Sequence, residues 1–321
     1  MESAARIFVA GHSGLVGSAV LRRLRSEGFK NILTATRDQL DLRDQAAVNY
    51  WFRANRPDYV FLVAGTVGGI LANSTRPAEF IYDNLLIHAT TVHASHLYGV
   101  TKLLYLGSSC IYPRDVSQPM TESTLLTAPL EPTNEPYAIA KIAGIKLCQS
   151  YRTQYGSNFV SAMPSNLYGP HDNFDLESAH VLPALMRKFH EAKIAGRRQV
   201  TIWGSGKPRR ELLHVDDLAT ACVFLMHHYN DESHINVGSG EDLSIRELAE
   251  TIQAVVHPAA ELVFDETKPD GTRRKLLDVT RMRSLGWRPT IPLRAGIEST
   301  YRWFLENHAA DEPLDRTRSN A

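Results

Sequence analysis

Tyr137 and Lys141 are four residues apart, the separation at which two side chains on a helix share one face. Pro136 precedes them, and apolar residues then recur at helical spacing as far as Tyr155, so we expect one helix here. The ammonium should lower the phenol pKa from its usual value of about 10, which makes the pair a proton donor and acceptor. Alone, such a pair is more often part of a solvated helix face.

Two serines follow a strand-like run, at a place where parallel sheets bind ligands. Residues 102–107 have the apolar character of a strand, and Ser108 and Ser109 come next. Ligands of open parallel sheets lie at the carboxyl ends of the strands. We therefore predict a hydride-transfer triad in which Ser108 positions a carbonyl, Tyr137 protonates its oxygen and Lys141 holds the nicotinamide ribose. A polar strand end is the weaker alternative for the serines.

A glycine-rich turn near the N-terminus predicts where a dinucleotide binds. The spacing Gly-x-x-Gly-x-x-Gly lies between a strand-like run, 6–10, and a helical pattern that ends at Gly28. Such glycines allow a tight turn and a close approach of the backbone to a pyrophosphate, and the helix N-terminus favours negative charge. An ordinary glycine-rich turn is the alternative. The predicted cofactor contacts are Gly11, His12, Ser13, Gly14, Leu15, Val16 and Gly17.

The residues at the end of the second strand-like run predict whether the protein binds NADP or NAD. It ends in Thr36-Arg37-Asp38. An arginine suits the 2′-phosphate of NADP, whereas a carboxylate would bind the ribose hydroxyls of NAD. Arg37 therefore predicts NADPH/NADP, while Asp38 directly after it keeps NAD open. We expect Asp41 and Leu42 at the edge of the adenine pocket, with a surface turn as the alternative.

Strands and helices alternate along the first half of the chain. Strand-like runs at 6–10, 31–36, 58–63, 102–107 and 158–163 alternate with helical patterns up to 28 and at 44–55, 80–99 and 137–155. The alternation predicts an α/β fold with a Rossmann-type doubly wound parallel sheet. Residues 1–165 would form the NADP-binding domain, with elements near 211–240 returning to it. Residues 166–308 would mainly form a smaller mixed α/β C-terminal substrate domain, and 309–321 a flexible tail.

The composition narrows the possible functions. The 35 basic residues equal the 35 acidic ones, which argues against nucleic acid as a partner, and no apolar run is long enough to span a membrane. Cys110, Cys148 and Cys222 lack metal-ligand spacing, so no metal site is predicted. The few cysteines and the lack of a signal-peptide core favour a cytoplasmic protein.

Combined with longer strings, these motifs resemble a known family. The glycine turn, the Ser…Tyr-x-x-x-Lys arrangement and the appended C-terminal domain are similar to the extended short-chain dehydrogenase/reductases. Within them, the longer strings resemble the GDP-L-fucose synthases, up to about residue 308. The strings are Val67-Gly-Gly-Ile70, Leu106-Gly-Ser-Ser-Cys-Ile-Tyr-Pro113, Leu130-Glu-Pro-Thr-Asn-Glu-Pro-Tyr-Ala-Ile-Ala-Lys-Ile-Ala-Gly-Ile145, Asn166-Leu-Tyr-Gly-Pro170, Leu213-His-Val-Asp-Asp217 and Lys268-Pro-Asp-Gly271.

The resemblance implies a 3,5-epimerase/4-reductase that acts on a GDP-linked 4-keto-6-deoxy sugar, GDP-4-keto-6-deoxy-D-mannose. It assigns Cys110 as the base and His180 as the acid at C3 and C5 of the sugar. A thiol and an imidazole, with usual pKa values of about 8.5 and about 6.5, suit proton transfer in both directions. Without the resemblance, Cys110 would be interpreted as a small buried filler and His180 as a neighbour of a helix N-cap.

The resemblance also implies binding residues and a homodimer. The dimer contact would use the helices at 80–99 and 137–155. Substrate contacts would be Lys188, Trp203, Arg210 and Asp270, for which a solvated surface loop is the alternative. Further cofactor contacts would be Leu106, Gly107, Ser108, Ser109, Lys141, Pro164, Ser165, Asn166, Leu167 and His180.

The sequence departs from the family pattern at several positions. Ser13, Thr66 and Lys188 stand where arginine, lysine and arginine are usual, and Leu212 replaces a phenylalanine. Arg37 is thus left to discriminate between NADPH and NADH. Two alternatives stay open: a related GDP-sugar epimerase/reductase of the GDP-colitose or GDP-heptose type, and a dinucleotide-sensing protein without chemistry. A sensor would need the glycines but not the five polar residues Ser108, Cys110, Tyr137, Lys141 and His180.

Overall fold

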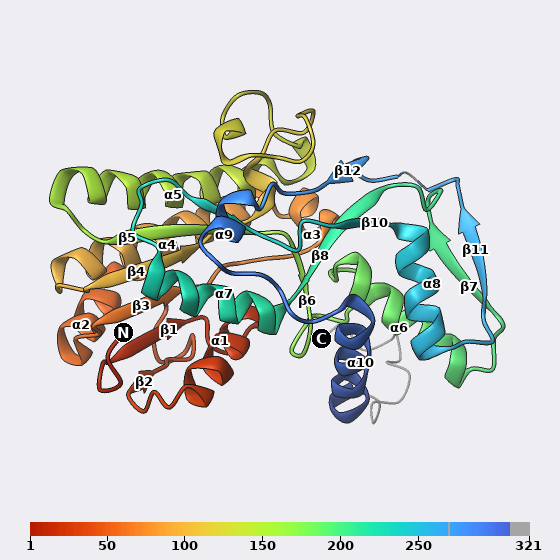
Figure 1. Ribbon diagram of the computed structural model, residues 1–321, viewed down its shortest axis with the longest axis horizontal. Helices are drawn as coiled ribbons and strands as arrows, with labels where there is room; N and C mark the ends of the chain where they lie inside the picture. Colours follow the sequence, from red (N-terminus) through yellow and green to blue (C-terminus); the bar gives the residue numbers. More distant parts are fainter. Residues whose placement is uncertain (269, 309–321) are drawn as a thin grey trace, which may run out of the picture.

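The computed structural model describes residues 1–268 and 270–308, and a six-stranded parallel sheet forms its first layer (Figure 1). The strand order is β2-β1-β3-β4-β5-β9, and every neighbouring pair runs parallel. The order reverses at β1, which is where doubly wound sheets bind ligands. The strands are β1 (Ile7–Ala10), β2 (Ile32–Leu33), β3 (Tyr59–Leu62), β4 (Lys102–Leu106), β5 (Phe159–Pro164) and β9 (Ile235–Val237).

Helices cover both faces of this sheet (Figure 1). Apolar residues of α1 (Leu15–Ser26) and α7 (Val215–His228) bury one face. Those of α2 (Gln45–Asn55), α4 (Pro77–Leu97) and α5 (Glu135–Tyr155) bury the other. The short helix α3 (Ile70–Thr75) lies just before α4. These layers confirm the predicted fold class, although the second strand is shorter than its apolar run.

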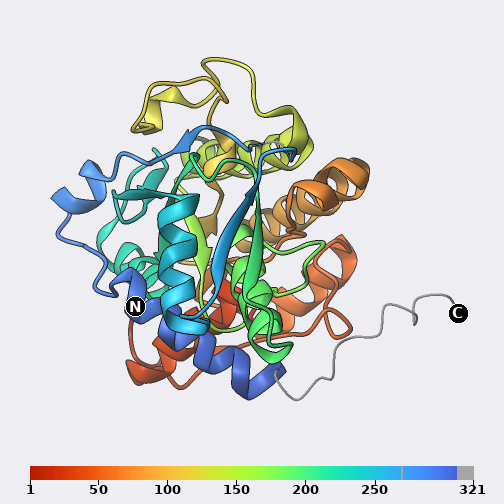
Figure 2. The same cartoon turned by 90° about the vertical axis from the view of Figure 1, so that its right-hand side faces the viewer.

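A second region, which faces the viewer in Figure 2, is built on short strands and the helices that pack on them. Strand β8 (Arg209–His214) pairs with β6 (Asn166–Tyr168), β10 (Asp242–Ser244) and β12 (Arg274–Lys275), and β7 (Gln199–Trp203) pairs with β11 (Glu261–Asp265). Buried apolar residues of α6 (Val181–Ile194), α8 (Ile245–Val256) and α10 (Leu293–His308) form its core. Helix α8 begins with a capping box between Ser244 and Glu247.

The chain crosses between the two regions more than once. Residues 166–214 run mainly in the second region, whereas α7 and β9 return to the first sheet. The short helix α9 (Thr280–Ser284) follows β12. The predicted tail, 309–321, lies outside the described residues. Among those described, no helix combines the length and the apolarity needed to cross a bilayer.

Candidate active site

The glycine turn between β1 and α1 is closed so tightly that side chains are excluded. A Cβ atom on Gly17 would lie 1.9 Å from the carbonyl oxygen of Gly11, and one on Gly11 would lie 2.7 Å from the Cα of Ala64. Gly11 also has a φ of +90°, in the left-handed region that favours glycine. The two glycines therefore let α1 start directly over the end of β1.

The first turn of α1 is open to an anion. Gly14 occupies the N-cap without a side-chain hydrogen bond, and the first turn contains no acidic residue. The amides of such a turn lack partners within the helix and carry a positive partial charge. His12 adds a buried Nδ1 atom that has no hydrogen-bond partner among the residues the structure describes. These features fit the pyrophosphate of a dinucleotide.

The loop after β2 presents two arginines, one of which the sequence motifs did not single out. Arg37 is exposed. Arg43 donates to Asp41 (2.7 Å) and to Asp83 of α4 (2.8 Å), and its guanidinium lowers the pKa of Asp41 to about 2. Asp83 also accepts a hydrogen bond from the Thr66 hydroxyl (3.1 Å). Thr66, which replaces a usual lysine, is thus part of this polar network.

The predicted triad comes together at the carboxyl end of β4. The Lys141 ammonium donates to the carbonyl of Leu106 (2.9 Å) and lies 5.7 Å from the ring centre of Tyr137. The Ser108 hydroxyl accepts a hydrogen bond from the Cys110 amide (3.4 Å). It also interacts with the Tyr137 phenol, which lowers the pKa of that phenol.

Burial governs the protonation of the triad. It raises the pKa of Tyr137 well above the usual value, and the negative charge that Cys110 can carry raises it further. Burial also lowers the pKa of Lys141 to about 8. The predicted lowering of the Tyr137 pKa by Lys141 is therefore wrong for this structure: the lysine points at Leu106, and desolvation of the phenolate dominates. A protonated Tyr137 is suited to donate a proton.

Cys110 lies against the triad in a small apolar cluster. It belongs to a 3-10 helix, Ser109–Ile111, and packs with Ala72, Phe80, Tyr137 and Ala138. Burial raises the pKa of its thiol, while the Ser108 hydroxyl and the ammonium groups of Lys275 and Lys141 oppose that rise. The thiol is therefore buried among apolar side chains while two ammonium charges act on it.

His180 directly precedes α6, but its side chain does not cap the helix. It occupies the N-cap position without a side-chain hydrogen bond, and its imidazole is exposed. The surrounding protein nevertheless lowers its pKa, and the charge of Lys275 adds to this effect. The loop before it is anchored near Cys110, because the amide of Gly69 donates to the carbonyl of Ser178 (2.9 Å) and α3 follows directly. Cys110 and His180 thus share one cationic neighbour.

The carboxyl ends of β4 and β5 are closely packed. A Cβ on Gly107 would lie 2.2 Å from the sulfur of Met163. Ser165, just after Pro164, is buried, and its hydroxyl has no hydrogen-bond partner within residues 1–268 and 270–308. Asn166 donates its side-chain amide to the carbonyl of Glu211 (3.0 Å), which joins β6 to β8. The Ser165 hydroxyl is therefore a candidate to bind a ligand at these strand ends.

An exposed tryptophan stands at the far end of the second region. Trp203, 65% exposed, ends β7, with the Lys188 ammonium 4.9 Å and that of Lys268 5.6 Å from its ring centre. Such a ring can stack on a flat base while the lysines attract phosphate. Lys268 lies in one of the family strings but was not predicted as a contact.

Arg210 and Asp270 support the turn beside this tryptophan. Arg210 donates to the carbonyl of Thr272 (2.6 Å). Asp270 accepts hydrogen bonds from the amide (2.9 Å) and the hydroxyl (2.6 Å) of Ser205. Both Asp270 oxygens thus hold the chain around Gly204 in place. That Arg210 and Asp270 bind the substrate stays a prediction.

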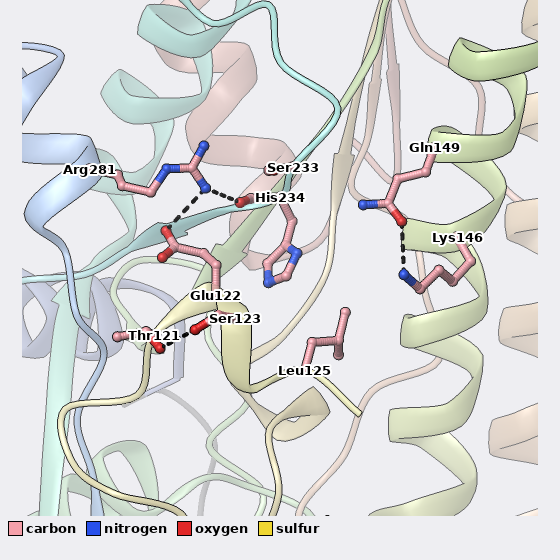
Figure 3. Close-up of a pocket in the computed structure, with 9 residues that line it drawn as sticks. All are labelled: Thr121, Glu122, Ser123, Leu125, Lys146, Gln149, Ser233, His234 and Arg281. Carbon is pink, nitrogen blue, oxygen red and sulfur yellow. Dashed lines mark hydrogen bonds and ion pairs between the residues drawn. The ribbon is translucent and has the colours of Figure 1, made fainter. Parts of the chain in front are cut away.

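A hollow of about 480 Å³ lies away from the predicted residues (Figure 3). Arg281 lines it, but the charge of that arginine is already balanced by Glu122 (3.8 Å) and Asp231 (3.6 Å). None of its lining residues was predicted for the site. They are Thr121, Glu122, Ser123, Leu125, Lys146, Gln149, Ser233, His234 and Arg281.

Comparison with known proteins gives the family. The model of the NAD dependent epimerase/dehydratase family matches residues 7–238. The chain belongs to this family. Among the described residues of this epimerase/dehydratase family member, no group of three or more His, Cys, Asp and Glu side chains could hold a metal ion.

Several relatives resemble the chain over most of its length. It is 56% identical to GDP-L-fucose synthase of Escherichia coli (strain K12), covering 94% of this chain and 97% of that protein. It is also 56% identical to GDP-L-fucose synthase 1 of Arabidopsis thaliana, covering 95% of each. A solved GDP-L-fucose synthetase of Naegleria fowleri bound to NADP has a TM-score of 0.90 at 32% identity, covering 97% of this chain and 95% of that one. GDP-L-colitose synthase of Yersinia pseudotuberculosis matches at 36%, covering 95% of this chain and 100% of that protein.

Proposed function

We propose that this chain converts GDP-4-keto-6-deoxy-D-mannose to GDP-L-fucose by epimerising C3 and C5 and then reducing the C4 ketone with NADPH. The observation that carries the proposal is the convergence of Ser108, Cys110, Tyr137 and Lys141 at one strand end. The identity of 56% to named GDP-L-fucose synthases supports the choice of sugar. A simple carbonyl reductase would need no thiol beside its tyrosine.

The residues around the glycine turn are suited to hold NADPH, which supplies the hydride when bound. The open first turn of α1 would take the pyrophosphate, and exposed Arg37 would take the 2′-phosphate. Lys141 would hold the nicotinamide ribose, and Ser165 would offer its free hydroxyl nearby.

Epimerisation would use Cys110 and His180 on opposite faces of the sugar. The C4 ketone acidifies the protons on C3 and C5. The Cys110 thiolate would remove one of these protons, and His180 would return a proton to the other face of the same carbon. The hydroxyls of Tyr137 and Ser108 would stabilise the enolate oxygen formed in between. Repeating the exchange at the second carbon inverts both centres.

Reduction would use the same two hydroxyls for a different purpose. As hydride reaches C4, negative charge develops on the ketone oxygen, and Tyr137 would donate its proton there. The raised pKa of Tyr137 keeps the phenol protonated until that moment.

The GDP end would be bound in the second region. Trp203 would stack on the guanine, while Lys188 and Arg210 would neutralise the diphosphate. Lys188 is a point charge where a planar guanidinium is usual, so we expect looser orientation of the phosphates. Asp270 would act by holding the turn next to Trp203.

We infer a cytoplasmic homodimer. The cysteines Cys110, Cys148 and Cys222 are all free and buried, which fits a reducing compartment. Helices α4 and α5 pack side by side and expose large apolar side chains, among them Tyr82, Leu85 and Ile139. Such a surface fits a second copy of the chain.

The test is turnover of GDP-4-keto-6-deoxy-D-mannose with NADPH or NADH, followed by absorbance and by identification of the sugar product. We expect GDP-L-fucose, with NADPH preferred because of Arg37. Tyr137→Phe should abolish reduction and leave part of the proton exchange at C3 and C5, because Ser108 still holds the enolate oxygen. Full reduction by this variant would refute the role of the phenol.

The second candidate function is the same type of reaction on a related GDP-sugar, and the same assay distinguishes the two substrates. Ser13, Thr66 and Lys188 depart from the family pattern around both ligands, which favours testing GDP-colitose and GDP-heptose precursors in parallel. Faster turnover of one of these sugars would replace the proposed substrate. Absence of turnover with every sugar and both cofactors, together with NADPH binding, would favour a dinucleotide sensor.

A further inference from the structure

Tyr105 is buried beneath the helix that carries Lys141. It lies near the end of β4, and its ring belongs to the core on the sheet face that α4 and α5 cover. Its hydroxyl donates to the carbonyl of Lys141 (3.2 Å). The Nδ1 atom of His88, on α4, donates to the carbonyl of Ala140 (3.2 Å). Two successive carbonyls of α5 are therefore tied to side chains outside that helix.

A glycine lets α5 come this close to the ring. A Cβ on Gly144 would lie 2.4 Å from both the Cζ and the hydroxyl oxygen of Tyr105. Gly144 is three residues after Lys141, so the two residues lie on the same face of the helix. The helix face that carries Lys141 is thus packed directly on the Tyr105 ring.

The Lys141 ammonium lies over two aromatic rings. Its nitrogen is 5.4 Å from the ring centre of Tyr105 and 5.7 Å from that of Tyr137. A cation within about 6 Å of a ring is attracted by the negative face of the π system, and more strongly where water is excluded, as around the buried Lys141. The hydrogen bond of the ammonium goes to the carbonyl of Leu106 (2.9 Å), a neutral acceptor, so the ammonium keeps its full charge.

Other titratable groups face Lys141 from the elements around it. They are His88 from α4, Cys110 from the 3-10 helix and Tyr137 from α5 itself. Burial lowers the pKa of His88 well below its usual value, and it raises the pKa of Cys110 and of Tyr137. It raises the pKa of Tyr105 as well. These groups are therefore mainly uncharged near neutral pH, and aromatic faces stabilise the ammonium where a negative charge does not.

We propose that Tyr105 is a positioning residue for reduction, whose ring holds the Lys141 ammonium at the end of β4 in its charged form. The proposal rests on the proposed function, in which Lys141 holds the nicotinamide ribose. An ammonium has three N–H donors, and after the bond to Leu106 two remain for the ribose hydroxyls. The ring carries this role, whereas the Tyr105 hydroxyl holds the helix carbonyl.

The test follows the protonation of Lys141 in the full chain without substrate or cofactor. Protein containing isotope-labelled lysine is titrated by NMR, and the ε-carbon signal that disappears in Lys141→Arg is the reporter. Burial sets the wild-type pKa at about 8. In Tyr105→Leu we expect the midpoint to fall by about one pH unit, because the ring no longer stabilises the charged form. Tyr105→Phe keeps the ring and should keep the wild-type midpoint.

A fluorinated series gives a second reading that nearly preserves the packing. Phenylalanines with one, two and three ring fluorines are incorporated at position 105. Each fluorine weakens the negative face of the ring, so the Lys141 midpoint should fall stepwise from that of Tyr105→Phe. Phe61→Leu removes a buried ring from the neighbouring strand β3, on the opposite face of the sheet, and should leave the midpoint unchanged. Thermal unfolding verifies that each variant is folded.

NADPH binding connects the titration to the cofactor. At about pH 7.5, between the two midpoints, Tyr105→Leu should bind NADPH about threefold more weakly than the wild type, because about a third as many molecules carry the ammonium. Fluorescence of the bound dinucleotide measures the affinity. Equal affinities in the wild type and a folded Tyr105→Leu would contradict the role of the ring.

The titration also separates this proposal from a loss of packing and from the proposed function. Water that entered the space left in Tyr105→Leu would relieve desolvation and raise the midpoint, so a rise overturns the proposal. One constant midpoint across the fluorinated series overturns it as well. If the midpoints fall as expected while the wild type turns over none of the sugar, the proposed function fails and the role of Tyr105 toward Lys141 stands.

Discussion

At the scale of single residues, burial decides the chemistry of this site more than neighbouring charge does. Burial raises the pKa of Tyr137 and of Cys110, and lowers that of Lys141 to about 8. The phenol thereby becomes a proton donor, whereas the thiol needs nearby cations to serve as a base. Ser108 contacts both groups, so one hydroxyl links the two halves of the proposed reaction.

Cys110→Ser tests the base at this scale. A hydroxyl gives up its proton far less readily than a thiol, so deuterium uptake from solvent at C3 and C5 should fall about 100-fold or more. Mass spectrometry of the sugar after incubation in heavy water measures the uptake. The control is Cys148→Ser, which changes a different buried thiol that lies on α5. This variant should keep wild-type uptake. Unchanged exchange in Cys110→Ser would remove this thiol from the mechanism.

At the scale of elements, the site depends on how closely α1 approaches β1. The approach is possible because Gly17 faces the carbonyl of Gly11 with no atom between them. The same approach directs the first-turn amides of α1 to the strand end. Strands β4 and β5 carry the other half of the site, and their ends are closed by the contact of Gly107 with Met163.

Gly17→Ala and Gly14→Ala form a matched pair at this scale. A Cβ at Gly17 would meet the Gly11 oxygen at 1.9 Å, whereas one at Gly14 would meet it at 3.7 Å, an ordinary contact. Overpacking costs about 1–3 kcal/mol, so Gly17→Ala should lower the Tm by several degrees. Gly14→Ala should change it little. Thermal unfolding without cofactor measures both, and equal melting temperatures would mean that the turn relaxes freely.

At the scale of the whole molecule, α4 and α5 present one broad surface on the side of the sheet away from α1 and α7 (Figure 1). Tyr82 is 63% exposed there, and His93 joins the two helices through its contact with the Tyr151 hydroxyl (2.6 Å). Of the two helices, α5 also carries Tyr137 and Lys141. Pairing through this surface would therefore brace the helix that holds the predicted triad residues.

Leu85→Glu tests this pairing. Leu85 of α4 is partly exposed, so a carboxylate there should leave the fold intact while placing two like charges across a symmetric contact. Light scattering should report about 36 kDa for the variant and twice that mass for the wild type. Tyr50→Glu, on α2 and outside this surface, should stay dimeric. A monomeric wild type would refute the homodimer.

The elements and the triad could be predicted because their signals are local. A helix can be recognised from apolar residues that recur at helical spacing over a few turns. Tyr137 and Lys141 share a face because they are four residues apart on such a helix. The glycine turn and the strand end at Ser108 are equally local. Arg43 pairs with Asp83 forty residues away, so no spacing in the sequence could indicate this contact.

The sequence by itself determined the alternation of strands and helices, the glycines that the turn requires, and the residue types available for proton and hydride chemistry. Only the tertiary structure decided how those groups ionise. Desolvation depends on every atom packed around a side chain, and those atoms come from segments that are distant in the chain. For that reason the pKa of the Tyr137 phenol is higher than the nearby Lys141 led us to predict.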